Sequence, residues 1–169
     1  MYDIRRRDSQ PRRNVRLRYA AATMAITLGI LLAGGRGTRL GLGWPKALVS
    51  LAGRTLLERA QDILGPVCDE VIVVAPAALG LPVPEIARIA DPPGGEGPLA
   101  GLVAGLGARS FQRAVVLGVD FPLMRPALLV GLADLLPGHA AVLPLAAGMP
   151  QPLAAVYAPE AASRLAASW

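Results

Sequence analysis

Apolar runs recur along the chain and alternate with segments of mixed polarity. The strongest runs are rich in Val, Ile, Leu and Ala, and they predict buried strands at residues 26–32, 70–75, 114–119 and 152–157. Shorter runs predict two further strands at residues 86–90 and 140–143. Such continuous runs, without alternation of apolar and polar positions, are typical of parallel strands that are covered on both faces.

Helical patterns fill most of the intervals between these strands. They predict helices at residues 55–64, 98–108, 126–136 and 159–167. Thr55, followed three residues later by Glu58, fits a capping box at the first helix, and Pro98 fits the first turn of the second. Strands that alternate with helices predict a Rossmann-like, three-layer α/β fold, with a mostly parallel sheet and helices on both faces.

The carboxyl ends of the strands are the expected binding edge of such a sheet. Three features follow strand ends directly: a glycine-rich stretch at residues 33–46, Asp91, and Asp120. Because parallel strands end at the same edge, we expect all three features to face one crevice.

The only lysine of the chain closes the glycine-rich stretch. The sequence holds sixteen arginines, whereas Lys46 is its single lysine. Glycines let the backbone approach a ligand closely, and Arg39 and Lys46 add two cations, so the stretch suits a polyphosphate. The alternative is an ordinary surface lysine that follows a turn.

Two aspartates and a helix start complete the predicted site. Asp120 ends a buried strand, and one carboxylate beside phosphates is a typical Mg²⁺ ligand, although it also fits a helix N-cap. Asp91 suits a base or ribose contact, or only an Asp-Pro turn. The helix start at Gly97, Pro98 and Leu99 suits a close approach to a ligand, or ordinary helix-on-sheet packing.

Several function classes are excluded by the composition. The glycine-rich stretch lacks the Gly-Lys-Ser/Thr of a P-loop and the third glycine of the dinucleotide fingerprint. The single histidine, His139, and the single cysteine, Cys68, supply no nucleophilic pair and no thiolate metal site. Cys68 is expected to be a small buried filler.

The positive charge is confined to the first residues of the chain. Residues 1–23 hold seven arginines and two aspartates, whereas the remaining residues hold ten basic and ten acidic side chains. We predict that residues 1–23 form a basic, disordered extension and that residues 24–169 form a single domain without nucleic-acid partners. No membrane span is expected, and the location is expected to be cytoplasmic, because cleavage of a leader at the glycine-rich stretch would remove the first strand.

Taken together, the motifs resemble those of molybdenum cofactor guanylyltransferases, in the MobA-like nucleotidyltransferase family. The matching segments are Leu32-Ala33-Gly34-Gly35 with Arg39, Gly41 and Lys46, Asp91 with Gly97-Pro98-Leu99-Ala100-Gly101-Leu102, Asp120-Phe121-Pro122, and Gly148-Met149-Pro150-Gln151-Pro152-Leu153. The resemblance implies a nucleotidyltransferase fold and Mg²⁺-dependent transfer of GMP from GTP to the molybdopterin cofactor, with release of pyrophosphate.

The resemblance also implies roles for individual residues. Leu32, Ala33, Gly34 and Gly35 would meet the nucleotide through their backbone, and residues 97–99 would lie near it. Lys46 and Arg39 would bind the triphosphate and serve catalysis, Asp91 would contact guanosine, and Asp120 would bind GTP and Mg²⁺. The segment Gln151-Pro152-Leu153 would lie near the acceptor.

Two alternatives remain open at this point. The Gly-Thr-Arg-Leu and Pro-Lys segments are also similar to those of sugar-phosphate nucleotidyltransferases, which favours transfer of CMP or UMP. The sequence ends at Trp169 without the family's C-terminal Asn-Thr-Pro segment. A catalytically impaired protein that binds nucleotide or cofactor, and passes cofactor to a molybdoenzyme or chaperone partner, is therefore the second alternative.

Overall fold

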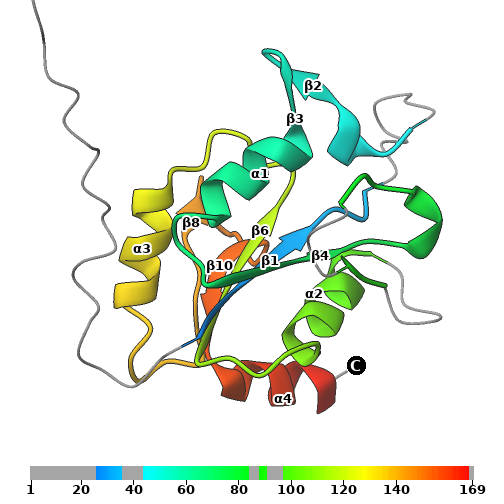
Figure 1. Ribbon diagram of the computed structural model, residues 1–169. Coiled ribbons are helices and arrows are strands. Elements are labelled where there is room, and N and C mark those ends of the chain that lie inside the picture. Colours follow the sequence, from blue (N-terminus) through cyan, green and yellow to red (C-terminus); the bar gives the residue numbers. More distant parts are fainter. Residues whose placement is uncertain (1–25, 36–43, 84–87, 91–96, 168–169) are drawn as a thin grey trace, which may run out of the picture.

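A central sheet of six strands organises the protein (Figure 1). The computed structural model describes residues 26–35, 44–83, 88–90 and 97–167. The strands lie in the order β5-β4-β1-β6-β10-β7. Their bounds are β1 Thr27–Leu32, β4 Glu70–Val74, β5 Arg88–Ile89, β6 Arg113–Gly118, β7 Ala141–Val142 and β10 Ala154–Tyr157. The strands β5, β4, β1 and β6 are mutually parallel, whereas β10 runs antiparallel to its neighbours β6 and β7. The prediction of a mostly parallel sheet is therefore confirmed.

Helices cover both faces of this sheet, which confirms the predicted three layers. Figure 1 shows α1 and α3 on one side and α2 and α4 on the other. Their bounds are α1 Leu56–Leu64, α2 Pro98–Gly107, α3 Pro126–Asp134 and α4 Pro159–Ala167. Every residue of β1 is buried because successive side chains point to opposite layers. Leu31 packs in the cluster formed with α1 and α3, whereas Ile30 and Leu32 pack in the cluster with α2 and α4.

The predicted start of α1 is confirmed in detail. The Thr55 hydroxyl accepts a hydrogen bond from the Glu58 backbone N–H at 3.2 Å, and the Glu58 carboxylate accepts one from the Thr55 backbone N–H at 2.7 Å. These two bonds satisfy donors that a helix start otherwise leaves without partners. The Thr55 hydroxyl also donates to the same carboxylate oxygen at 2.9 Å. The backbone N–H and the hydroxyl of Thr55 together lower the pKa of Glu58 below its usual 4.5, because both donors favour the charged carboxylate.

Two short hairpins and two 3₁₀ turns were not predicted from the sequence. The hairpins join β2 (Ser50–Leu51) to β3 (Arg54–Thr55) and β8 (Leu145–Ala146) to β9 (Met149–Pro150), and the turns are η3 (Lys46–Leu48) and η4 (Ala77–Leu79). Each hairpin turns through an alanine and a glycine that both have positive φ. Strands of two residues are too short to produce a recognisable hydrophobic period.

The first strand is an integral part of the sheet rather than an appendage. It lies between β4 and β6, pairing with β6 along its full length and with β4 from Leu28 onward. Its first residue is held on both sides: the Thr27 N–H donates to an Asp69 carboxylate oxygen at 2.9 Å, and Arg113 Nε donates to the Thr27 hydroxyl at 2.8 Å. Among the helices in the described part of the chain, none has the length and apolar character needed to cross a membrane.

Candidate active site

Lys46 is held at the carboxyl edge of the sheet by the backbone on either side of it. Its N–H donates to the Gly35 carbonyl at 3.0 Å, which ties the lysine to the segment that leaves β1. Its own carbonyl accepts a hydrogen bond from Val49 at 3.1 Å, and the neighbouring Ala47 is fully buried. Gly35 packs along the lysine stem, because a Cβ added there would lie 3.7 Å from Lys46 Cβ and Cδ. The start of the lysine side chain is thereby fixed while its ammonium group reaches outward.

Asp120 is held by the end of the neighbouring strand β6. The Val119 N–H donates to the Leu32 carbonyl at 3.1 Å, so contact between β6 and β1 continues to the residue before the aspartate. The Phe121 N–H then turns back to the Gly118 carbonyl at 3.3 Å. Asp120 therefore stands on a tight turn directly beyond the sheet.

The ammonium group of Lys46 and the carboxylate of Asp120 meet at this edge. Lys46 Nζ lies 3.5 Å from Asp120 Oδ2, with the two side chains 30% and 48% exposed. The expected convergence of the glycine-rich stretch and Asp120 is therefore confirmed for these two residues. Both remain open to solvent, so a ligand can reach them.

Some of the other residues that were predicted to contact the nucleotide lie at the same edge of the sheet. Leu32 ends β1, and the buried Ala33 continues beyond it with its N–H donating to the Val74 carbonyl at 2.9 Å. The Ala33 N–H is thus engaged within the protein, and any contact of this residue with a nucleotide must use another atom. Gly34 is half-buried and Gly35 exposed. Arg39 and Asp91 lie outside the described residues.

The start of α2 has the geometry expected of a close backbone approach. Gly97 has a φ of +85°, a conformation that side chains disfavour, and a Cβ added there would meet nothing within 4 Å. Pro98 occupies the first turn, and Gly97, Pro98 and Leu99 are all exposed. The positive φ explains the glycine, whereas the nucleotide contact remains a prediction.

The structure also brings the segment at residues 151–153 beside the tip of β6. The Gly118 N–H donates to the Leu153 carbonyl at 2.7 Å, immediately after the antiparallel pairing of β10 with β6. The Tyr157 hydroxyl donates to the Pro152 carbonyl at 2.8 Å and braces the same segment. Burial raises the pKa of Tyr157 to about 12, so this hydroxyl keeps its proton at neutral pH.

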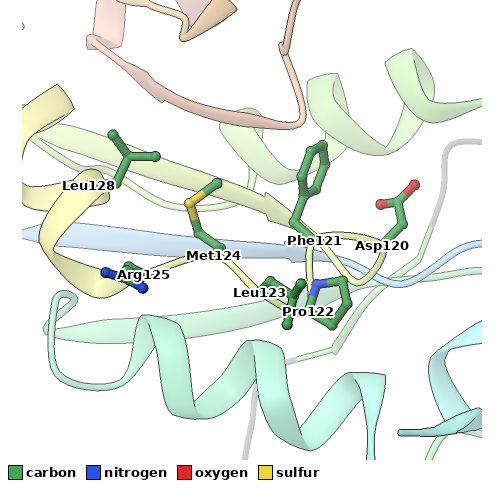
Figure 2. A pocket seen from close by; sticks show the side chains of 7 residues that line it. All are labelled: Asp120, Phe121, Pro122, Leu123, Met124, Arg125 and Leu128. Carbon is green, nitrogen blue, oxygen red and sulfur yellow. The ribbon is translucent and has the colours of Figure 1, made fainter. Parts of the chain in front are cut away.

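An open surface cavity of about 510 Å³ begins at Asp120 and follows the connection from β6 to α3. Its lining is mostly apolar. The residues that line it are Asp120, Phe121, Pro122, Leu123, Met124, Arg125 and Leu128. Figure 2 shows Asp120 at one end of this row and Arg125 and Leu128 at the other. The volume falls in the range of small-molecule sites. Sequence reasoning identified Asp120 but missed the cavity, because a hollow depends on how the connection folds.

Asp120 fits a magnesium ion better than a metal with several protein ligands. In the described parts of the chain, no three His, Cys, Asp or Glu side chains gather closely enough to hold a metal ion. Mg²⁺ commonly takes one or two carboxylates and completes its octahedron with water and substrate phosphates, whereas a structural zinc needs four protein ligands. A half-exposed carboxylate next to the ammonium group of a lysine therefore fits Mg²⁺.

Cys68 and His139 lie on other segments than Lys46 and Asp120, with Cys68 before β4 and His139 before β7. Cys68 is partly buried beside Gly29, and burial raises the pKa of its thiol to about 12. A thiol with that pKa keeps its proton at neutral pH and is a poor nucleophile. His139 is exposed in a turn, where its Nδ1 lies 3.1 Å from the Pro137 carbonyl oxygen.

Fold and site together define a Rossmann-like nucleotidyltransferase domain, with a cation and a carboxylate at the carboxyl ends of adjacent strands. A family model described as the MobA-like NTP transferase domain matches residues 29–169. The chain belongs to this family.

Individual relatives agree with the family assignment. A probable molybdenum cofactor guanylyltransferase from Chloroflexus aggregans is 39% identical over 133 residues, which cover 76% of this chain and 64% of that protein. The chain thus spans slightly less than two thirds of this relative. The solved structure of molybdopterin-guanine dinucleotide biosynthesis protein A from Archaeoglobus fulgidus has a TM-score of 0.69 and 30% identity, covering 83% of this chain and 72% of that one.

A shorter match is to a relative with a different named substrate. A 2-C-methyl-D-erythritol 4-phosphate cytidylyltransferase from Deinococcus radiodurans is 52% identical over 62 residues. This match covers 37% of the present chain and 26% of the relative. It agrees with the similarity to sugar-phosphate nucleotidyltransferases noted in the sequence.

Proposed function

We propose that this protein transfers GMP from GTP to the molybdopterin cofactor and releases pyrophosphate. The names of the Chloroflexus and Archaeoglobus relatives support this substrate pair. The observation that carries the proposal is the 3.5 Å approach of Lys46 to Asp120 at the carboxyl edge of a nucleotidyltransferase sheet. A single cation and a single carboxylate, both open to solvent, suit a triphosphate and its metal ion.

The reaction needs no covalent protein intermediate. A phosphate oxygen of the acceptor attacks the α-phosphorus of GTP and forms a new P–O bond. The bond from the α-phosphorus to its bridging oxygen breaks, and pyrophosphate leaves with that electron pair. Positioning and charge neutralisation accelerate such a displacement, and we assign both tasks to Lys46, with Arg39 as a second cation on the triphosphate.

We assign Asp120 as the protein ligand of Mg²⁺. Bound Mg²⁺ supplies positive charge between the carboxylate and the phosphate oxygens, which would otherwise repel each other. Without nucleotide, Lys46 neutralises the same carboxylate at 3.5 Å. When a triphosphate arrives, its oxygens give the ammonium group a new set of partners.

The remaining nucleotide contacts are assigned to backbone beside this pair. Leu32, Ala33, Gly34 and Gly35 leave the end of β1 next to Lys46, which supports their contact with the nucleotide. Because the Ala33 N–H is engaged by Val74, we assign the approach to phosphate to the two glycines. The helix start at residues 97–99 and Asp91 are proposed to contact the nucleoside, with Asp91 on guanosine.

We propose that the acceptor occupies the cavity that begins at Asp120. A group bound there presents its phosphate beside the metal-binding carboxylate, as an attack on the α-phosphorus requires. Arg125 supplies one cation at the far end for an anionic group. The compartment that we propose is the cytoplasm, as expected for an enzyme that uses GTP.

The test is pyrophosphate release by the purified full chain with GTP, CTP or UTP, each combined with molybdopterin cofactor or 2-C-methyl-D-erythritol 4-phosphate. We expect turnover with GTP and molybdopterin cofactor only. Turnover with CTP and the methylerythritol phosphate would instead establish the cytidylyltransferase alternative. Binding of Mg²⁺ and GTP without pyrophosphate release would favour a nucleotide-binding protein that hands cofactor to a molybdoenzyme or chaperone.

A further inference from the structure

Gly118, the last residue of β6, is a glycine that the local backbone does not require. The described glycines with positive φ are Gly53, Gly80, Gly97, Gly138 and Gly148, and Gly118 is not among them. It lies in a regular strand, where glycine has no side chain to pack and weakens the sheet. The reason for this glycine must therefore be sought in what surrounds it.

The space beside the Gly118 Cα is occupied by the carboxylate of Asp120. A Cβ added at Gly118 would lie 2.6 Å from Asp120 Oδ1, closer than non-bonded atoms approach each other. It would also lie 3.5 Å from two carbons of the Phe121 ring. A methyl group at residue 118 and the observed carboxylate cannot both be accommodated.

The backbone at Gly118 has little freedom to yield. Gly118 pairs with Leu32 of β1 on one side, and its N–H donates to the Leu153 carbonyl at 2.7 Å on the other. Its carbonyl accepts a hydrogen bond from Phe121 at 3.3 Å. Because three segments hold this peptide, the Asp120 side chain is the group that would have to move.

We propose that Gly118 is a positioning residue for Asp120. The open space over its Cα receives Oδ1, and the other oxygen, Oδ2, is thereby directed at Lys46 Nζ, 3.5 Å away. Gly118 thus fixes the direction in which the carboxylate meets a cation, whether ammonium or metal. The inference rests on the proposed function only where it takes Asp120 as the metal ligand.

Other described glycines differ from Gly118 in what they make room for. Gly105 is required by the core, since a Cβ there would lie 2.5 Å from Ile30 Cγ2. Gly35 adjoins the partner of Asp120, but its distance of 3.7 Å from the lysine stem is an ordinary contact. Gly131, in α3, would meet nothing within 4 Å and offers a matched control.

The experiment is the substitution Gly118→Ala in the full chain, with Mn²⁺ as a paramagnetic probe of the metal site. Titration without nucleotide, followed by electron paramagnetic resonance, is expected to give a dissociation constant about tenfold higher than wild type, the size typical of residues that orient a ligand. In pyrophosphate release we expect a lower kcat with an almost unchanged KM for GTP. Gly131→Ala should leave the Mn²⁺ affinity unchanged.

A double-mutant cycle separates positioning from general damage. Asp120→Ala removes the proposed metal ligand, so the cycle is measured by thermal unfolding and not by Mn²⁺ binding. If Gly118 acts through Asp120, Gly118→Ala should lower stability more in wild type than in an Asp120→Ala background. Equal losses in both backgrounds, or wild-type Mn²⁺ affinity in Gly118→Ala, would overturn the proposal.

The outcome is independent of the substrate assignment. If wild type releases no pyrophosphate from any nucleotide and Gly118→Ala still weakens Mn²⁺ binding, the proposed function fails and the positioning role stands. If wild type is active and Gly118→Ala matches it in both Mn²⁺ affinity and kcat, the positioning role fails and the proposed function stands.

Discussion

The ammonium group of Lys46 lies 3.5 Å from the carboxylate of Asp120, joining the segment after β1 to the tip of β6. An ion pair this open to solvent contributes little to stability, because water screens it and both side chains lose freedom. Its importance is electrostatic. Each group holds a counter-charge at the place where, in the proposed reaction, phosphate and metal bind together.

Removal of the Lys46 charge should have opposite effects on metal binding and on GTP binding. In Lys46→Met, Mn²⁺ without nucleotide is expected to bind Asp120 more tightly than in wild type, because no ammonium group competes for the carboxylate. GTP should bind at least about tenfold more weakly, because a charge-assisted contact to phosphate is lost. Titration calorimetry of each ligand measures both effects. Arg164→Ala, at an exposed cation on α4, is the control and should change neither.

Loss of the carboxylate should remove activity without unfolding the protein. Asp120 is 48% exposed and sits beyond the sheet, so Asp120→Ala should change the free energy of unfolding by less than about 0.5 kcal/mol. Pyrophosphate release should fall by a factor of at least about a hundred at any Mg²⁺ concentration. Denaturant unfolding and a pyrophosphate assay test the two halves separately. Activity restored by excess Mg²⁺ would contradict the assignment of Asp120 as the metal ligand.

Arg125 should affect the acceptor and not the nucleotide. It lines the far end of the cavity that begins at Asp120. In Arg125→Ala, KM for the molybdopterin cofactor is expected to rise about tenfold through loss of one charged contact, whereas KM for GTP stays at the wild-type value. Steady-state kinetics with each substrate varied in turn measures the split. An equal rise in both KM values would show that the cavity does not serve the acceptor alone.

The capping box of α1 should contribute to stability but not to chemistry. Thr55→Ala removes the hydroxyl that accepts from the Glu58 N–H and is expected to lower the free energy of unfolding by about 1 kcal/mol. Pyrophosphate release should be unchanged, since α1 lies in the layer outside the sheet. Chemical denaturation of both proteins at neutral pH provides the comparison.

The same substitution predicts a change in pH dependence. Because Thr55 lowers the pKa of Glu58, this carboxylate stabilises the fold above pH 4.5 and loses its contribution as the pH falls below that value. Thr55→Ala removes the hydroxyl donor but keeps the backbone N–H, which has the larger effect on the pKa, so it should flatten the decline in stability on acidification only in part. Thermal unfolding between pH 3 and 7 measures it, and parallel curves for the two proteins would contradict the assignment.

Much of the fold was predictable from local pattern. The strands β1, β4 and β6 are continuous apolar runs because both of their faces are buried, and such runs can be recognised in the sequence alone. The capping box of α1 is equally local, since its two partners lie three residues apart. The hairpins β2–β3 and β8–β9 escaped prediction because two residues per strand carry no period.

The candidate site was likewise predictable from the sequence only in part. The sequence by itself determined that Lys46 and Asp120 stand beyond strand ends, and the rule for parallel sheets predicted that they would share an edge. Only the tertiary structure decided their distance of 3.5 Å, the cavity beyond Asp120, and the fact that Gly118 makes room for a carboxylate oxygen. The physical reason is that strand formation depends on neighbours along the chain, whereas side-chain contacts depend on strand register and torsion angles that fix atoms from distant segments in space.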